Sequence, residues 1–463
     1  LFSSNSRSIQ GNHCWSKDMS FKCKSKSLLK VVLLIEALVL PAILGCWLAY
    51  GTTWTAYDFK VLDWFYSRAV TYGYGPPRAP QIAYVTINDA SYATSGENFL
   101  DRGKMARINN ALAELGVASV AYDIIFAHPS SPQADQAFTA SLTNLGKVYL
   151  PIVLKRDPAL AHFQWGRGAA FERLRSQQLQ TPQEHGTPRP FEASHAFLQL
   201  DAFALAAVNT GHITAFPDAD GIYRHLHLLV KIDTGYLPTL ALAMFLDAVQ
   251  VPLRAVTIAW GEMVTIPALP GSKLTRDLLI PIDEEGRVFV PHAQAWKHEV
   301  SVMPAHALLE YMEEPDLRGN LTEFFEEKFV FVADVSSGIA DLGPTSLDAG
   351  APLVVLHTAL MNGLLTRTFY RQWTFAETLG LIALLSILVG LAAVPQSSIP
   401  LYLTGGGIGL LLLGFTALQC LHFVLFPIVT VGGSFAGVFL SLVIGLEIAI
   451  TRDQAFIRET FSK

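Results

Sequence analysis

The chain has 463 residues, of which 51% are hydrophobic, and its mean hydropathy is +0.35. Long polar stretches are also present, so the apolar residues must be concentrated in segments. The formal net charge is −6, and the segment from Gly51 to Gln372 is mildly acidic, which argues against nucleic acid or an anionic membrane surface as the partner of that segment.

Four apolar segments each reach the roughly 20 residues that a helix needs to cross the hydrocarbon core of a bilayer. They are residues 28–50, 374–394, 400–423 and about 426–450. A signal peptide is the alternative for the first segment, because basic residues precede it. Its apolar run is too long for that, and no small-x-small cleavage site follows before Tyr50. We therefore expect a membrane anchor.

The charges beside these segments predict the orientation of the chain. Cationic residues precede the first segment or lie at its start, namely Arg7, Lys17, Lys22, Lys24, Lys26 and Lys30. We therefore expect the protein in the cell (inner) membrane, with both termini in the cytoplasm. The large domain is expected to be periplasmic or extracellular. The predicted domains are a tail (1–27), a first span (28–50), an outer domain (51–372), three spans (373–450) and a cytoplasmic lead-in (451–463).

The four cysteines restrict the chemistry of the outer domain. Cys14 and Cys23 precede the first span, while Cys46 and Cys420 fall inside spans. The outer segment has none, which excludes a thiolate metal site or a cysteine nucleophile there. A domain of about 320 residues buries enough core to fold without disulfides.

The first third of the outer domain alternates between strand and helix patterns. Residues 81–87 are β-rich, residues 102–115 carry apolar side chains at helical spacing up to Gly116, and residues 118–126 form a second apolar run. Residues 135–145 and 147–154 repeat the helix–strand order. This order predicts an α/β unit with a mostly parallel sheet.

The rest of the outer domain begins with a polar stretch, residues 155–195, which we expect to be a surface excursion. Residues 223–232 and 328–335 are predicted strands, and residues 237–249 and 357–365 are predicted helices. Residues 279–282 and 288–290 are expected to pair as a hairpin across Glu285-Gly286. The predicted fold class is an α/β outer domain with a mixed sheet plus four transmembrane helices.

Several short pieces, in this order, resemble a known family. They are Val61-Leu62-Asp63-Trp64, Tyr84 to Asp89, Val120 to Phe126, Gly211-His212, Asp218-Ala219-Asp220-Gly221-Ile222-Tyr223-Arg224, and the segment from Val330 through Asp341, Thr345 and His357. Together with the three spans that follow, they resemble the CHASE domain of the second type, an extracytoplasmic sensory module associated with cyclases and histidine kinases.

The resemblance implies a transmembrane receptor that passes an outside stimulus to a cytoplasmic output. Residues 452–463 resemble the lead-in to a class III adenylate or guanylate cyclase domain. The catalytic residues of such a cyclase are not in this sequence, which begins with Leu1, so we expect a processed or partial chain without cyclase activity of its own. Active sites in that family form between two catalytic domains, which implies a homodimer or a partner in a membrane complex. The alternative is an accessory subunit whose outer domain is an interaction platform.

Acidic residues after predicted strands are the first candidate ligand site. Asp89 and Asp123 are expected at the carboxyl ends of neighbouring strands, where ligand crevices of open α/β sheets form, and Asp341 is expected to join them. Three carboxylates could hold a hard cation or an amine. Acidic residues in such places also cap helices and turns, and this alternative stays open.

The remaining site candidates are Asp220, Arg224 and His357. Asp218 and Asp220 flank Gly221 with a spacing that resembles a calcium loop, but the required bidentate Glu is missing, so a turn stabilised by aspartates is favoured. The histidines lack the spacing of a metal site. No catalytic motif, metal or cofactor is predicted, and the expected partners are the lipid bilayer and an extracytoplasmic ligand or protein.

Overall fold

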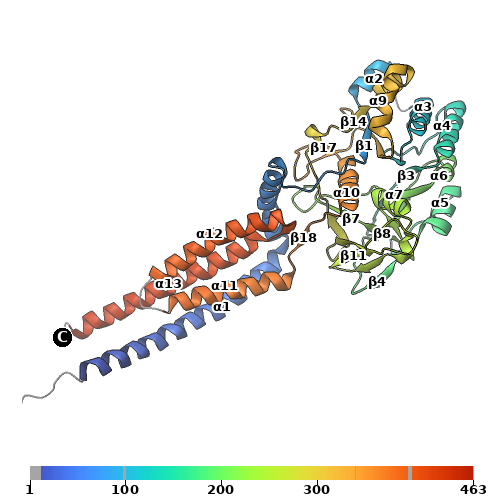
Figure 1. Cartoon of the computed structure of the whole chain (residues 1–463). Coiled ribbons are helices and arrows are strands. Elements are labelled where there is room, and N and C mark those ends of the chain that lie inside the picture. Colours follow the sequence, from blue (N-terminus) through green and yellow to red (C-terminus); the bar gives the residue numbers. More distant parts are fainter. Residues whose placement is uncertain (1–11, 97–100, 339, 395–398, 462–463) are drawn as a thin grey trace, which may run out of the picture. The chain divides into compact units, whose positions relative to one another are not determined.

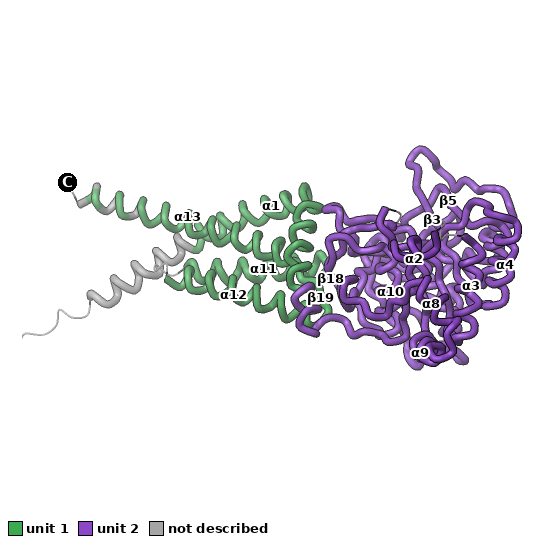
Figure 2. The backbone as a smooth tube through the Cα atoms, turned by 90° about the horizontal axis from the view of Figure 1, so that it is seen from above, with its two compact units in different colours: residues 1–65, 373–463 green, residues 66–372 purple. Residues whose placement is uncertain are grey.

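The computed structural model describes residues 12–96, 101–338, 340–394 and 399–461. Arg7 and Lys463, two of the basic residues beside the spans, lie outside these ranges. The chain divides into two compact units, drawn in green and purple in Figure 2: residues 1–65 with 373–463, and residues 66–372.

Four helices in the described part of the chain are long and apolar enough to cross a membrane, and they match the four segments predicted from hydropathy. They are α1 (Asn12–Thr71), α11 (Phe375–Ala393), α12 (Ile399–Leu421) and α13 (Ile428–Phe461). α1 contains Pro41 and has non-helical backbone angles at Tyr50. The apolar run ends at Tyr50, but the helix continues to Thr71.

Glycines let the helices of this first unit pack closely. A Cβ atom at Gly405 of α12 would lie 2.3 Å from Phe439 of α13, and one at Gly445 of α13 would lie 2.3 Å from Ile35 of α1. A larger side chain at either position would push the helices apart. The small residues therefore support packing within the chain.

The second unit is built around a mixed sheet, in which the strand order is β14-β1-β15-β2-β3-β5 and β6 also pairs with β3. All pairs in this sheet are parallel except that of β5 with β3. The strands are β1 (Ile82–Ile87), β2 (Ser119–Tyr122), β3 (Val148–Lys155), β5 (His195–Phe197), β6 (Asn209–His212), β14 (Val302–Pro304) and β15 (Phe329–Asp334). The predicted α/β class with a mixed sheet is confirmed.

Helices cover both faces of the sheet, because alternate residues of each strand point to opposite sides (Figure 1). In β1, Ile82 and Tyr84 pack in one hydrophobic core, and Ala83, Val85 and Ile87 pack in the other. The first core includes α7 (Leu240–Val249) and α10 (Val354–Thr366). The second includes α3 (Arg102–Glu114), α4 (Pro132–Leu145), α6 (Asp201–Ala206), α8 (Ala305–Glu313) and α9 (Pro315–Phe325).

Local sequence signals account for the ends of several helices. Asn88 accepts from the Ser91 amide and begins α2 (Asp89–Ser95) with a capping box. Ser131 begins α4 by accepting from the Ala134 amide. Gly116, at φ +67°, follows the end of α3, as its position in the sequence predicted.

Smaller sheets and short helices complete the second unit. A four-stranded sheet has the order β12-β11-β10-β4, and β7–β13, β8–β9 and β16–β17 form pairs. The elements are α5 (Ala169–Arg173), the π-helix η1 (Leu174–Gln178), β4 (Gln183–His185), β7 (His225–His227), β8 (Leu229–Ile232), β9 (Gly235–Pro238), the 3-10 helix η2 (Leu253–Ala255), β10 (Thr257–Ala259), β11 (Met263–Ile266), β12 (Leu278–Pro281), β13 (Arg287–Phe289), the 3-10 helix η3 (Trp296–His298), β16 (Leu342–Gly343), β17 (Ala351–Pro352) and β18 (Arg371–Gln372), while β19 (Val424–Leu425) belongs to the first unit.

The expected hairpin between residues 279–282 and 288–290 is wrong. The tight turn exists, since the Asp283 amide donates to the Arg287 carbonyl at 3.0 Å and Gly286 has φ +75°. However, β12 pairs with β11, and β13 pairs with β7. Both strands find partners outside the turn, so the chain reverses there without forming a two-stranded ladder.

Candidate functional site

The carboxyl ends of β1, β15 and β2 carry the aspartates that the sequence singled out. β15 lies between β1 and β2, so the strands before Asp89 and Asp123 are not immediate neighbours, contrary to expectation. Exposed Asp89 accepts hydrogen bonds from the Ser337 amide and hydroxyl, both at 2.8 Å. Asp334, which the sequence analysis did not select, accepts from Tyr92 at 2.6 Å. Asp89 and Asp334 thus hold the loop and helix beside this edge.

The carboxylates of Asp123 and Asp341 are close enough for their charges to interact. Burial raises the pKa of Asp123 to about 7, and the negative charge of Asp341 adds to this rise. Asp341 itself is exposed. Within the described residues there is no group of three or more His, Cys, Asp or Glu side chains arranged to hold a metal ion. Asp89, Asp123 and Asp341 therefore do not form a cluster of three carboxylates that could hold a metal ion.

Arg224 lies in a buried ion-pair network. Its side chain has 0% exposure and makes a bidentate pair with Asp220, through Nη1 at 2.8 Å and Nη2 at 2.9 Å. Nη1 also lies 3.2 Å from Asp218. Burial of Asp218 raises its pKa, but the hydrogen bonds and charges of His225 and then Arg224 outweigh this and lower it. The hydrogen bond from Arg224 lowers the pKa of Asp220 against a smaller opposing effect of burial. The two aspartates therefore stabilise a buried cation. The side chains of Asp220 and Arg224 pair with each other.

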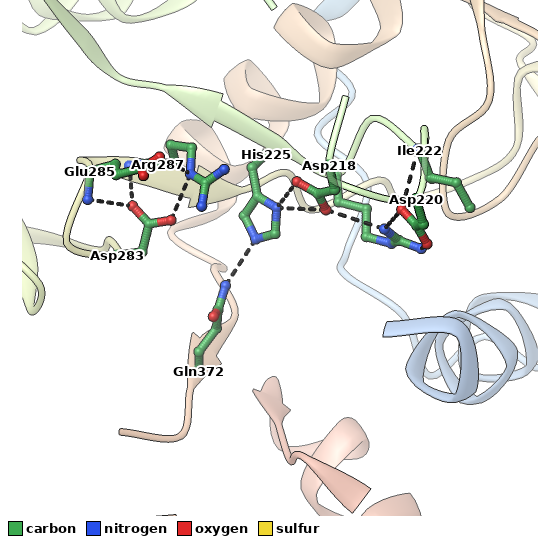
Figure 3. Close-up of polar contacts among 9 residues, drawn as sticks. Asp218, Asp220, Ile222, His225, Asp283, Glu285, Arg287 and Gln372 are labelled. Carbon is green, nitrogen blue, oxygen red and sulfur yellow. Dashed lines mark hydrogen bonds and ion pairs between the residues drawn. The ribbon is translucent and has the colours of Figure 1, made fainter. Parts of the chain in front are cut away.

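His225 extends this network to the end of the unit. Figure 3 shows its ring between Asp218 on one side and Gln372 on the other. Nδ1 is 2.9 Å from Asp218 Oδ1, and Nε2 is 2.9 Å from Gln372 Nε2. A carboxylate only accepts, so Nδ1 carries a proton and donates it to Asp218. Gln372 is the last residue of the unit and directly precedes Trp373, from which the chain enters α11.

A second ion pair lies at the turn before β13. Arg287 Nε donates to Asp283 Oδ2 at 2.8 Å, and the Asp283 carboxylate also accepts from the amides of Glu285 and Arg287 (Figure 3). The nearby negative charges raise the pKa of Arg287 against the opposing effect of burial. This pair borders a cavity of about 620 Å³, whose lining also includes Phe191, His227 and Gln372. Its volume lies within the range of small-molecule sites.

Buried histidines form a separate feature. His357 of α10 is 2% exposed, and its Nδ1 has no hydrogen-bond partner within the described residues. Burial lowers the pKa of His357 and of His227 to about 4. Burial, together with electrostatic repulsion from His357 and His227, also lowers the pKa of His212 well below its ordinary value. These rings are neutral at pH 7, and within the described residues they belong to no group of three or more His, Cys, Asp or Glu side chains that could hold a metal ion.

The family model of the CHASE2 domain matches residues 37–392. The chain belongs to the CHASE2 family. CHASE2 is an extracellular sensory domain of signalling receptors, so this chain is a membrane protein that carries a sensor domain. Neither a comparison with curated proteins nor one with solved structures gives a match.

Membership of the CHASE2 family agrees with the pieces that suggested it. The segment from Asp218 to Arg224 forms the buried network, and the strands before Asp89 and Asp123 lie in the central sheet. Sequence reasoning missed Gln372, Asp283 and Arg287 as members of the site. The one available signal for Gln372 was its place beside the second span, since no local motif marks a side chain that bonds to a residue 147 positions earlier.

Proposed function

We propose that this CHASE2 chain is a receptor module that senses an extracytoplasmic stimulus and drives a class III nucleotide cyclase in the cytoplasm. The sensor domain lies outside the (inner) membrane, both termini lie in the cytoplasm, and movement of the first and second spans carries the signal. A second copy of the chain brings two catalytic domains together. The proposal extends what the family establishes, which is an extracellular sensor in a signalling receptor.

The observation that carries the proposal is the contact between His225 and Gln372. The buried network of Asp220, Arg224, Asp218 and His225 reaches Gln372, three residues before the second span begins at Phe375. A buried, hydrogen-bonded network tolerates few alternative arrangements, since separating Arg224 from its two carboxylates leaves uncompensated buried charges. A stimulus that rearranged the network would therefore change the position of the chain at Gln372 in a discrete step.

Cyclase output tests the route directly. A class III cyclase catalytic domain is fused after Lys463 of the full chain, and cyclic AMP is assayed in membranes. Gln372→Leu removes the hydrogen bond to His225 and is expected to change the output several-fold. Gln177→Leu, the same substitution at an exposed glutamine, is the matched control and should leave the output unchanged. Equal output from both variants and the parent fusion would refute coupling through Gln372.

A further inference from the structure

We propose that a pocket at the amino end of β1 binds a small, uncharged molecule with hydroxyl or amide groups, and that this pocket is the stimulus site. The proposal rests on the proposed sensory function and names its ligand class. The pocket lies within the second unit and is formed by the segment before β1, the residues around η3 and one face of α10.

The pocket is small and chemically mixed. Its volume is about 50 Å³, whereas one water needs roughly 10–15 Å³ on this measure, so it holds the equivalent of a few waters or one small molecule. Its lining includes Arg78, Tyr84, His292, Trp296, Thr358 and Asn362. The rings of Tyr84 and Trp296 meet edge to face at 5.3 Å and supply apolar surface.

One residue of the pocket lining, His292, has an unpaired ring nitrogen. His292 is 4% exposed, and its Nε2 has no hydrogen-bond partner within the described residues. Burial lowers the His292 pKa to about 4, so the ring is neutral at pH 7. The His292 carbonyl accepts from the Tyr66 hydroxyl at 2.6 Å, which fixes the residue in place. A buried polar atom without a partner is unfavourable, and a bound hydrogen-bonding group relieves it.

The charges around the pocket cancel. Arg78 Nη2 lies 2.6 Å from Glu299 Oε1, and Gln294 donates to Glu299 Oε2 at 2.6 Å. With one cation, one anion and a neutral imidazole, the pocket offers no net charge to compensate an ion that leaves water. The hydroxyls of Tyr84 and Thr358 lie 2.5 Å apart and can both donate and accept. The lining therefore favours an uncharged hydrogen-bonding molecule over an ion.

The pocket also touches both chain segments that lead to spans. Asn362 of α10 accepts from the Ala79 amide at 2.8 Å and donates to the Pro77 carbonyl at 3.0 Å. Pro77 to Ala79 follow α1, and α10 is the last helix before α11. A molecule in contact with Arg78, Ala79 and Thr358 thus bridges the segment after the first span and the helix before the second. Its binding free energy stabilises one arrangement of these two segments over others.

Binding is tested on the full chain in lipid nanodiscs. Glycerol and acetamide serve as uncharged probes, and formate and methylammonium as charged counterparts of similar size, in saturation-transfer NMR titrations. We expect saturable binding of glycerol or acetamide with a Kd on the order of 1–10 mM, which suits a ligand of so few atoms, and at least tenfold weaker binding of both ions. No saturable binding of either uncharged probe, or equal binding of the ions, overturns the proposal.

Two variants test whether the probes bind in this pocket. His292→Phe removes the unpaired nitrogen, and Ala359→Val adds methyl groups to the pocket wall without removing a side-chain hydrogen bond. Each is expected to weaken binding at least tenfold, whereas His298→Phe, an exposed histidine outside the pocket, should bind as the parent does. Undiminished binding in a folded His292 or Ala359 variant overturns the assignment.

The failure of this proposal is distinguishable from failure of the proposed function. If the probes do not bind but Gln372→Leu still changes the output of the cyclase fusion, the pocket assignment alone is wrong. If the probes bind with the expected variant pattern but leave the output unchanged, the binding site stands and its role as the stimulus site is wrong.

Discussion

Asp58 of α1 accepts a hydrogen bond from the Thr430 hydroxyl at 2.5 Å, although 372 residues separate them. The same carboxylate accepts from the backbone amides of Val429 and Thr430 at 2.5 and 3.1 Å. These amides belong to the first turn of α13 and have no partner within that helix. An acidic residue of α1 therefore caps α13 and offsets the positive end of its dipole.

Replacing Asp58 should loosen the packing of these helices. Asp58→Ala leaves two buried amides and a hydroxyl unpaired and is expected to lower the free energy of unfolding by about 2–3 kcal/mol. Asp58→Asn keeps one acceptor oxygen and should lose less. Thermal unfolding of the full chain in nanodiscs measures the effect. Lys60→Ala, an exposed residue of the same helix, is the control, and equal melting of the Ala variants at 58 and 60 would contradict the capping role.

Arg224 and Arg189 allow the contributions of a buried and an exposed ion pair to stability to be compared. Both pair with carboxylates, but Arg224 is 0% exposed, while Arg189 and Glu284 are 65% and 73% exposed. Arg224→Ala leaves two buried carboxylates uncompensated and should lower stability by about 3–5 kcal/mol. Arg189→Ala should change it by about 0–1 kcal/mol. Denaturant unfolding of the full chain, followed by tryptophan fluorescence, checks this, and similar midpoints for the two variants would show that the network is not structural.

His357 makes stability depend on pH on the acidic side. Its pKa in the folded chain is about 4, below the ordinary 6.5. Below about pH 6.5 the unfolded chain takes up a proton that the folded chain excludes, so the stability present above this pH is lost as the pH falls toward 4. The loss between pH 6.5 and 4.5 amounts to about 2 kcal/mol for this residue. His212 and His227 act in the same direction.

Melting curves of His357→Gln between pH 4.5 and 7 test this assignment, because glutamine is polar but does not titrate. The variant should lose less stability than the parent chain over this range. His298→Gln replaces an exposed histidine and should follow the parent curve. A variant curve at 357 with the full parental slope would mean that folding does not lower the pKa of His357.

Much of the fold follows from local sequence signals. Apolar runs located β1 and β15, helical spacing and Gly116 located α3, and hydropathy located the four membrane helices. Strand order did not follow, because β15 inserts between β1 and β2 from more than 200 positions further along the chain. The pairing of β13 with β7 was missed for the same reason, since a turn signal describes four residues and not the partners of the strands on either side.

The candidate site was less accessible to sequence reasoning. Asp220 and Arg224 could be selected because they are close in sequence, and they do form an ion pair. Gln372 and His292 carry no local signal, since their roles depend on packing against residues far along the chain. Burial is also what separates Asp123 from Asp89, which look alike in the sequence but differ in exposure.

Asp123 provides the opposite pH dependence to His357. Burial raises its pKa to about 7, with a further contribution from Asp341, so the folded chain keeps a proton that the unfolded chain releases above its ordinary 3.8. The stability linked to this proton is fully present below pH 3.8 and is lost as the pH rises toward 7. Above pH 7 the folded chain holds an ionised carboxylate in a place that disfavours charge.

Asp123→Asn should therefore stabilise the chain more at pH 8 than at pH 5, by about 2–3 kcal/mol, because asparagine stays neutral at both. Asp341→Asn removes only the repulsion from the neighbouring charge and should act in the same direction by a smaller amount. Thermal unfolding at the two pH values measures both effects. Infrared difference spectra of the parent chain should show a protonated carboxyl band at pH 5 that fades by pH 8 and is absent from Asp123→Asn. A gain for Asp123→Asn that is equal at the two pH values, together with no such band, would show that Asp123 is ionised throughout and that Asp341 does not raise its pKa.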